Sequence, residues 1–350
     1  MVRSSLKLMS AALLLASSAS AYATDINGAG SSFVAPLVKR WVAEYEKINP
    51  TVKIDYASIG SGGGIKGIDE KTIDFAGSDA PMGRKELKSV GGEGKIVEIP
   101  AAAGGVVPAY NLPGVEKEIN FTGEILADIY AGKITKWNDA RIAKINEGVA
   151  LPDLAITPAW RSDGSGTTYI FTNYLSTQSE SFKESIGAGK QVKWPVGQGG
   201  KGNEGVTQVV QGTKGAIGYI EQGYADSNKI TFGAVQNKSG KFVKSSTKAV
   251  SAAGAAAKLE GNLLAANIWN QAGEEAYPIS SFTYVIVYKD MVNIHDQAKA
   301  QELVNFLSWA IHDGQKYAEE LDYAPLAPEV AAKCDAALKM VTYHGDALKH

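Results

Sequence analysis

Helix-like and strand-like patterns alternate along nearly the whole chain, and this alternation restricts the possible folds more than any other feature of the sequence. Apolar residues within 33–45 recur at helical spacing, and the run at 52–56 alternates like a half-buried strand. A second helical pattern starts at about Ile65 and leads to another β-prone run at 73–77. Strands that are each followed by a helix pack as parallel sheets covered by helices. The sequence therefore predicts an α/β fold.

The length of the chain favours two lobes. A chain of 350 residues exceeds what one hydrophobic core usually supports, about 250–300 residues. The extended stretch 96–110, which contains the pair Gly104-Gly105, is interpreted as a crossing between lobes. Further expected elements are a helix at 123–132, a strand at 155–160, a helix from about Ser165, a strand at 215–220, a strand at 282–288 and an amphipathic helix ending near Ile311. The last strand and helix could return to the first lobe, and two crossings would form a hinge.

The first 23 residues have the organisation of a secretory signal peptide. Arg3 and Lys7 precede a short apolar run at 11–16, and small residues follow up to Ala23. The run is too short to be a transmembrane helix, which needs about 20 apolar residues. We expect cleavage after Ala23 and release into the periplasm. No lipid anchor is expected, because no cysteine lies near the cleavage point.

Charge and cysteine content exclude several classes of function. The formal net charge is −2, and loss of the two cations in the signal peptide would make the mature chain two charges more negative. Neither a nucleic-acid-binding surface nor a polybasic membrane surface is indicated. The single cysteine, Cys334, excludes an intramolecular disulfide and a cysteine-clustered metal site, and we expect it to be a small buried hydrophobe. No cofactor and no metal are expected.

Sequence motifs of common enzymes are missing. The chain has no Walker P-loop, no Gly-x-Ser-x-Gly elbow and no His-Glu-x-x-His motif. The glycine runs at 62–67 and 197–202 both fit the spacing of a dinucleotide-binding fingerprint, but two matches in a chain with 38 glycines carry little weight. All four histidines lie beyond residue 294, so no general base is evident near the glycine motifs. We therefore expect a binding protein rather than an enzyme.

Three short sequences place hydroxyl and glycine residues directly before a helical pattern. They are Gly30-Ser31-Ser32-Phe33, Ile59-Gly60-Ser61-Gly62-Gly63 and Asp163-Gly164-Ser165-Gly166-Thr167. The start of a helix has unpaired N–H groups and a partial positive charge, and it can therefore bind an oxyanion. Ordinary N-capping is the commoner role of such residues. If the three helix starts converge, they surround a tetrahedral anion with neutral donors.

Two charged residues make this interpretation more specific. Arg161, two residues before Asp163, offers a planar cationic fork suited to phosphate oxygens, although an ion pair with Asp163 is the simpler alternative. Asp79 follows the strand at 73–77 and should also point toward the anion. A carboxylate there accepts a hydrogen bond from a protonated phosphate and repels fully ionised sulfate. A plain turn residue is the alternative for Asp79.

Together these motifs resemble the periplasmic phosphate-binding proteins of phosphate-specific ABC transporters. The resemblance covers essentially the whole chain after residue 23, and it also includes the segments 74–81, 104–107, 199–203 and 215–219. It implies a type II periplasmic binding protein fold, with one lobe formed by 24–105 and 278–350 and the other by 106–277. The hinge would lie near 104–107 and 277–280. One departure is that Ser32 stands where well-known members have threonine, which preserves the hydroxyl.

The resemblance also implies a set of ligand contacts and partners. The implied phosphate ligands are Ser32, Phe33, Ser61, Asp79, Arg161, Ser165, Gly166 and Thr167, with Asp163 holding Arg161 in place. The implied partners are inorganic phosphate and the membrane permease subunits of an ABC phosphate transporter, and the implied state is a monomer.

Three alternatives remain open from the sequence. The first is a receptor for another tetrahedral oxyanion such as sulfate. The second is a phosphate-ester hydrolase with Ser165 or Ser61 as the nucleophile. The third is an envelope protein that captures phosphate for adhesion or sensing without transport.

Overall fold

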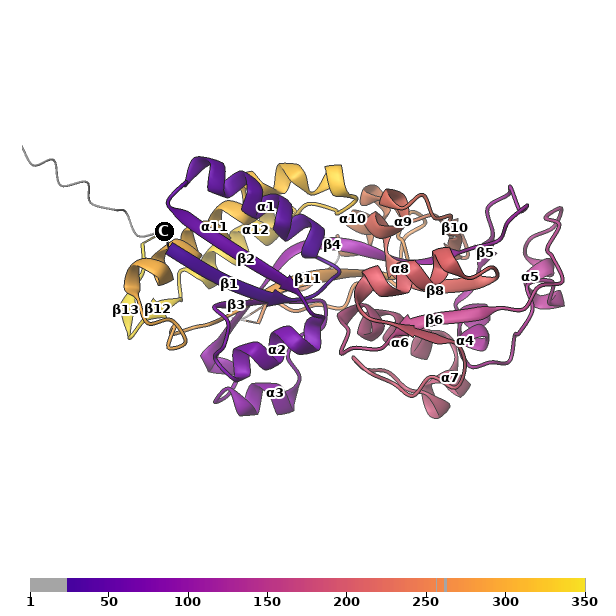
Figure 1. The fold of residues 1–350 in the computed structure, drawn as a ribbon, viewed down its shortest axis with the longest axis horizontal. Coiled ribbons are helices and arrows are strands. Elements are labelled where there is room, and N and C mark those ends of the chain that lie inside the picture. Colours follow the sequence, from indigo (N-terminus) through magenta and orange to yellow (C-terminus); the bar gives the residue numbers. More distant parts are fainter. Residues whose placement is uncertain (1–23, 256, 261–262, 350) are drawn as a thin grey trace, which may run out of the picture.

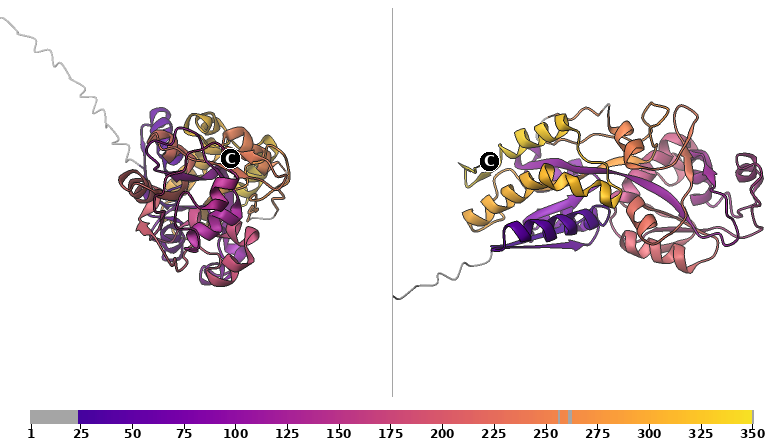
Figure 2. Two further views of the ribbon diagram at one scale, coloured as in Figure 1. Left: turned by 90° about the vertical axis from the view of Figure 1, so that its right-hand side faces the viewer. Right: turned by 90° about the horizontal axis from the view of Figure 1, so that it is seen from above.

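One long strand, β4 (Ile96–Tyr110), runs through both lobes of the molecule and connects them (Figure 1). The computed structural model describes residues 24–255, 257–260 and 263–349, so the expected signal peptide at 1–23 lies outside the described residues. The described chain begins and ends in the same lobe, and the middle of the sequence forms the other lobe (Figures 1 and 2). The expected α/β class is confirmed.

The first lobe is built from the two ends of the chain. Its strands are β1 (Thr24–Gly30), β2 (Val52–Ser58), β3 (Phe75–Ser78), the first part of β4, β11 (Ser280–Tyr288), β12 (Thr342–Tyr343) and β13 (Asp346–Ala347). Its helices are α1 (Ala35–Ile48), α2 (Ser61–Asp69), α3 (Arg84–Ser89), α11 (Gln297–Ile311) and α12 (Pro328–Leu338). Short 3-10 turns occur at Glu93–Lys95, Asp313–Tyr317 and Glu319–Leu321.

The second lobe contains the middle of the chain. Its strands are the second part of β4, β5 (Asn120–Phe121), β6 (Thr157–Arg161), β7 (Gln198–Gly200), β8 (Ala216–Glu221), β9 (Ala234–Gln236) and β10 (Phe242–Val243). Its helices are α4 (Gly123–Tyr130), α5 (Ala140–Lys144), α6 (Gly166–Gln178), α7 (Glu180–Ser185), α8 (Gly202–Gly212), α9 (Gln222–Ser227) and α10 (Thr247–Gly254). Helices cover both faces of the sheet in each lobe (Figure 1).

The main sheet has eight strands in the order β2-β1-β3-β11-β4-β8-β6-β7. The pairs β1–β2, β1–β3, β6–β8 and β6–β7 are parallel, whereas β11 runs antiparallel to β3 and β4, and β4 runs antiparallel to β8. The sheet passes from one lobe to the other only through β4, whose first part pairs with β11 and whose second part pairs with β8. In parallel sheets the carboxyl ends of the strands meet at one edge, and ligand sites form there.

Aromatic side chains fill the interior of both lobes. In the first lobe, Tyr45 packs edge-on against Phe306 and Trp309. In the second lobe, Phe171 stacks on Tyr219 with ring centroids 4.5 Å apart. Full burial of a large apolar side chain contributes about 1.5–3 kcal/mol, so these clusters hold each lobe together as a rigid unit. Cys334 is buried as expected.

The prediction that the second helix starts at about Ile65 was wrong, because α2 begins at Ser61. Glycine disfavours helix interiors, and the glycine run 62–64 therefore hid the first turn. The glycines are required by close packing, since a Cβ atom on Gly64 would lie 2.7 Å from the Gly30 Cα atom. The missing side chain allows α2 to lie directly against β1, at the cost of a lower helix propensity.

The two chain crossings between lobes are paired with each other. Gly105 of β4 lies opposite Ser280 of β11, and the Val106 amide donates to the Ile279 carbonyl at 2.9 Å. Gly104 and Gly105 both lie within the strand. A Cβ atom on Gly105 would approach the Ser245 Oγ atom to 2.1 Å. The glycine pair thus permits close packing at the crossing.

No helix within the described residues is both long enough and apolar enough to cross a bilayer.

Candidate functional site

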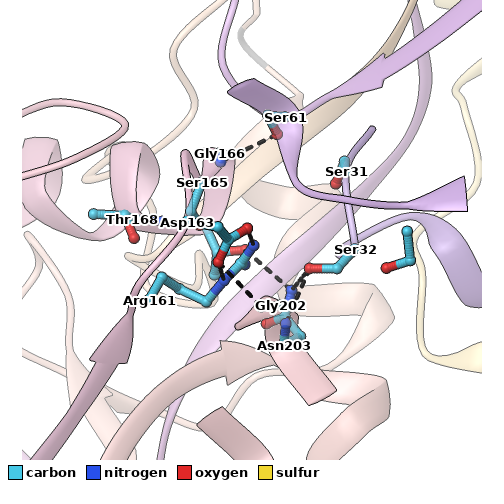
Figure 3. Close-up of polar contacts among 12 residues, drawn as sticks. Ser31, Ser32, Ser61, Arg161, Asp163, Ser165, Gly166, Thr168, Gly202 and Asn203 are labelled. Atoms are coloured by element: carbon cyan, nitrogen blue, oxygen red, sulfur yellow. Dashed lines mark hydrogen bonds and ion pairs between the residues drawn. The ribbon is translucent and has the colours of Figure 1, made fainter. Parts of the chain in front are cut away.

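Four helix starts meet where the two lobes touch, and they surround a cluster of buried polar side chains (Figure 3). The starts of α1 and α2 come from the first lobe, and the starts of α6 and α8 come from the second. The sequence motifs predicted three of these four helix starts as anion-binding sites, and the structure adds the start of α8. Because helix starts present unpaired N–H groups, their convergence creates an environment suited to a negative charge.

Asp79 lies just beyond the end of β3 and is buried among hydroxyl groups. Its Oδ1 atom accepts hydrogen bonds from the Ser31 Oγ atom at 2.5 Å and from the Thr283 Oγ1 atom at 2.8 Å. Burial raises the pKa of Asp79 to about 6, although these hydroxyls and the charge of Arg161 act in the opposite direction. The carboxyl group can therefore change its protonation state near neutral pH.

Ser61, the first residue of α2, links Asp79 to the second lobe. Its Oγ atom donates to the Asp79 Oδ2 atom at 3.3 Å and accepts from the amides of Asp79 and Gly166 at 3.2 and 3.1 Å. Gly166 has no room for a side chain, since a Cβ atom would lie 2.4 Å from Asp79 Oδ2. Glycine at the start of α6 therefore lets the two lobes meet at this point.

Arg161 ends β6 and is almost fully buried, with 4% of the residue exposed. Its Nε and Nη2 atoms donate to both carboxylate oxygens of Asp163 at 2.8 and 2.5 Å, and its Nη1 atom donates to the Thr167 Oγ1 atom at 3.2 Å. A guanidinium has five N–H groups, so these three bonds leave it with further capacity to donate. The bidentate pair fixes the plane of the guanidinium.

Asp163 also reaches the start of α8, because its Oδ1 atom accepts from the Gly202 amide at 3.0 Å. Burial acts to raise the pKa of Asp163, but the hydrogen bonds and charge of Arg161 outweigh it and hold the pKa below the ordinary value. Gly60 faces this carboxylate from the first lobe. Its φ is +85°, and a Cβ atom there would lie 2.2 Å from Asp163 Oδ2, so only glycine fits.

Ser32 meets the start of α8 through Asn203. The Ser32 Oγ atom accepts from the Asn203 backbone amide at 3.0 Å and from its Nδ2 atom at 2.9 Å. Asn203 is itself held on both sides, since its Nδ2 atom also donates to Thr167 Oγ1 and its Oδ1 atom accepts from the Glu221 amide. Ser32, Thr167 and Arg161 therefore belong to one connected network.

The remaining candidate residues lie at or near helix starts in the same region. Ser165 caps α6, with its Oγ atom accepting from the Thr168 amide at 2.9 Å. The Phe33 amide donates to the Ser31 Oγ atom at 3.0 Å, and the Phe33 carbonyl accepts from the Tyr323 hydroxyl. The structure thus brings all of Ser32, Phe33, Ser61, Asp79, Arg161, Asp163, Ser165, Gly166 and Thr167 into one interlobe region.

Three polar residues of this region were not chosen from the sequence. Ser31 belongs to the motif Gly30-Ser31-Ser32-Phe33, but nothing in the sequence indicated that it, rather than Ser32, would bind Asp79. Asn203 closes the glycine-rich segment 199–203, and a search for polar residues at helix starts could have found it. Thr283 lies inside a β-prone run and carried no local signal, because its contact with Asp79 spans 204 positions of sequence.

The donors that the site presents are suited to binding an anion. The site combines hydroxyl and amide donors with one guanidinium and two carboxyl groups. Ser61 and Ser165 both accept hydrogen bonds from backbone amides. The nearest partner of His312 is Asp335, on α12 of the first lobe. Among residues 24–255, 257–260 and 263–349 no group of three or more His, Cys, Asp or Glu residues could hold a metal ion.

Two α/β lobes that are joined by paired crossings and meet at a buried anion-type site define a substrate-binding protein of the periplasmic type. The family model described as a PBP superfamily domain matches residues 16–313. The phosphate-binding protein PstS of Pasteurella multocida is 44% identical over 319 residues, which covers 91% of this chain and 90% of that protein. The chain therefore belongs to the PstS-type family of phosphate-binding proteins.

Two further comparisons agree with this assignment. PstS of Xylella fastidiosa strain 9a5c is 44% identical over 316 residues, covering 89% of this chain and 84% of that protein. The crystal structure of a phosphate-binding protein from Stenotrophomonas maltophilia has a TM-score of 0.68 at 19% identity and covers 90% of this chain and 94% of that one. At that identity the structural likeness establishes the fold, and it confirms the expected periplasmic binding protein fold.

Proposed function

We propose that this protein binds inorganic phosphate with high affinity in the periplasm and delivers it to an ABC-type importer. The observation that carries the proposal is the interlobe site, in which four helix starts and one guanidinium surround the buried carboxyl group of Asp79, whose pKa is raised. Relatives at 44% identity are named phosphate-binding protein PstS. The donors are of the kind that phosphate oxygens require.

The proposed ligand contacts come from both lobes. Ser32, Phe33, Ser61 and Asp79 would contact phosphate from the first lobe. Arg161 and the start of α6, formed by Ser165, Gly166 and Thr167, would contact it from the second. Bound phosphate would take over donors that now bond across the lobes, such as the Gly166 amide. Asp163 would act indirectly, by keeping the guanidinium plane fixed through its bidentate pair with Arg161.

Asp79 would select for a protonated ligand. When ionised, its carboxylate accepts a hydrogen bond from a phosphate O–H group, whereas sulfate at neutral pH has no proton to give. A buried carboxylate would repel an unprotonated oxyanion oxygen beside it, because little water is present there to screen the two negative charges. This argument favours phosphate over sulfate as the ligand.

Closure of the lobes would couple binding to delivery. We propose that the first lobe comprises 24–105 and 278–350, that the second comprises 106–277, and that the hinge lies near 104–107 and 277–280. In support, the lobes are connected at the paired positions Gly105 and Ser280. A ligand that bonds both lobes binds the closed form better than the open form, and it therefore shifts the population toward closure.

The partners would be the permease subunits of the ABC importer, which would recognise the closed form of a monomer. The patterns at 1–23 indicate a cleavable signal peptide and export to the periplasm without a lipid anchor. The function requires neither a cofactor nor a metal.

Calorimetric titration of the purified protein with phosphate and then with sulfate tests the proposal. We expect saturable binding of one phosphate per chain and at least about 100-fold weaker binding of sulfate, because an unsatisfied buried charge costs about 3 kcal/mol or more. Equal affinities would refute the selectivity argument. Absence of phosphate binding, or turnover of a phosphate ester by metal-replete protein, would refute the proposed function.

A further inference from the structure

One ion pair crosses between the lobes away from the candidate phosphate contacts. The Lys190 Nζ atom lies 2.5 Å from Oε1 and 2.7 Å from Oε2 of Glu86. Glu86 belongs to α3 of the first lobe, whereas Lys190 lies between α7 and β7 of the second. Within the described part of the chain, no other ion pair joins residues of the two lobes.

Lys190 is tied to the candidate site through its backbone. Its carbonyl accepts from the amide of Ser165, the residue that caps α6. The preceding residue, Gly189, donates its amide to the Thr172 Oγ1 atom of α6 at 3.1 Å. The ammonium group is therefore carried on a segment that is fixed to the same helix whose first amides would bind phosphate.

Glu86 is equally well fixed on its own lobe. It is the third residue of α3, and its Oε2 atom accepts from the Gly83 amide at 2.7 Å, so the carboxylate caps the start of its own helix. The side chains of Glu86 and Lys190 are only 28% and 22% exposed. Since the Glu86 carboxylate is oriented before the lobes meet, the freedom lost when the pair forms is mainly that of the Lys190 side chain.

Because this ion pair joins the two lobes, its free energy of formation adds to the free energy of lobe closure and so to ligand binding. An ion pair within one lobe is present in both the open and the closed state, and it cannot shift the equilibrium between them. A pair that forms only when the lobes meet contributes its whole free energy to closure. Even the modest stabilisation typical of a partly exposed pair, up to about 1 kcal/mol, changes an equilibrium constant about two- to fivefold.

We propose that Lys190 and Glu86 form an interlobe latch that stabilises the closed state and thereby strengthens phosphate binding without contributing to selectivity. This inference rests on the proposed function for its ligand. The latch acts by positioning the lobes, and neither residue contacts the anion.

Two variants remove the charges and keep the structural roles. Lys190→Met keeps the side-chain stem and the backbone carbonyl that accepts from Ser165. Glu86→Gln keeps a side-chain oxygen that can accept from the Gly83 amide. Lys183→Met is a matched control, since Lys183 pairs with Glu180 inside α7 of one lobe.

We expect each latch variant to weaken phosphate binding about two- to fivefold in calorimetry, and Lys183→Met to leave it unchanged. The double variant should be no weaker than either single variant, because the two residues act as a pair. The reversed pair, Glu86→Lys with Lys190→Glu, should recover most of the affinity. The ratio of phosphate to sulfate affinity should stay constant throughout, which a disturbed binding site would not allow.

Different results would refute the latch proposal and the proposed function. If the wild-type protein binds no phosphate, the proposed function fails. Small-angle scattering of the ligand-free proteins then still tests the latch, which requires a more open ensemble in Lys190→Met than in Lys183→Met. If the wild-type protein binds phosphate and the single latch variants bind it as tightly as Lys183→Met does, or if their effects add in the double variant, the latch is refuted.

Discussion

The Ser32 hydroxyl and the Asn203 side chain meet across the interlobe contact, with the Oγ atom accepting one hydrogen bond from the Asn203 backbone amide and another from its Nδ2 atom. This contact joins the segment that precedes α1 to the first turn of α8. It also carries the network on to Thr167, to which Asn203 Nδ2 donates at 3.2 Å. Ser32 is thus held by the fourth helix start, which the sequence motifs had not indicated.

Replacing Asn203 should therefore weaken phosphate binding even though the residue carries no charge. Asn203→Ala removes the side-chain donor, and we expect a loss of affinity of about tenfold, equivalent to about 1.4 kcal/mol for one hydrogen bond. Asn203→Asp places a buried carboxylate beside the anion, and its loss should be larger by at least another factor of about ten. Titration calorimetry provides the measurement. Wild-type affinity in Asn203→Asp would exclude Asn203 from the site.

Removing the guanidinium of Arg161 should affect folding stability and binding separately. Arg161→Met leaves the Asp163 carboxylate without its bidentate partner, which should lower the free energy of unfolding by about 3 kcal/mol or more. Arg161→Met combined with Asp163→Asn removes both charges and should recover most of that stability.

Phosphate affinity should remain low in both Arg161 variants, because neither restores a cation to the site. Denaturant unfolding and calorimetry on the same samples separate the two effects. Recovery of phosphate affinity in the double variant would show that the guanidinium is dispensable for binding.

Discrimination against sulfate should depend on pH through Asp79. Burial raises its pKa to about 6, so the carboxyl is ionised above that pH and can accept a hydrogen bond from an O–H group of the ligand. Below it, the protonated group can donate to a fully ionised oxyanion. Competition dialysis should therefore show sulfate displacing labelled phosphate poorly at pH 8 and better at pH 5.

In Asp79→Asn, sulfate should displace phosphate at every pH as well as it does from the wild-type protein at low pH. The reason is that the asparagine amide can donate to an unprotonated oxygen. A variant that still rejects sulfate at pH 8 would mean that selectivity has another origin.

The carboxyl group of Glu98, buried on β4, should make folding stability fall as the pH rises. Burial raises its pKa from 4.5 to about 7, while the Met82 amide and the charge of Lys190 act in the opposite direction. The folded protein therefore binds this proton more tightly than the unfolded chain does. Its contribution to stability is complete below pH 4.5 and is lost as the pH rises to about 7.

Glu98→Gln mimics the protonated form and should remove this part of the pH dependence. At pH 8 the variant should be more stable than the wild type by on the order of 2 kcal/mol, and at pH 4 the two should be alike. Urea unfolding at both pH values provides the comparison. Equal stability of the two proteins at pH 8 would show that Glu98 ionises in the folded state without penalty.

The sequence predicted most of the elements because their signals are local. The apolar face of α1, with Leu37, Val38 and Trp41 buried, and the buried strand β11 follow directly from hydrophobic spacing. The start of α2 was misplaced because glycine has poor helix propensity, and the packing that requires Gly64 involves β1, which lies far away in sequence. Thr283 was missed because its partner Asp79 is 204 positions away, whereas Asn203 had a local signal in its place at the start of α8.

By itself the sequence determined the α/β alternation, the sets of residues able to begin helices, and the presence of one arginine next to a glycine-rich helix start. These features depend on spacing and residue type within a few turns of chain. Only the tertiary structure decided that four helix starts from two lobes face one another, that Asp79 is buried enough for its pKa to rise, and that Lys190 meets Glu86. Such outcomes depend on packing between segments that are distant in sequence, and no local pattern encodes the geometry of that packing.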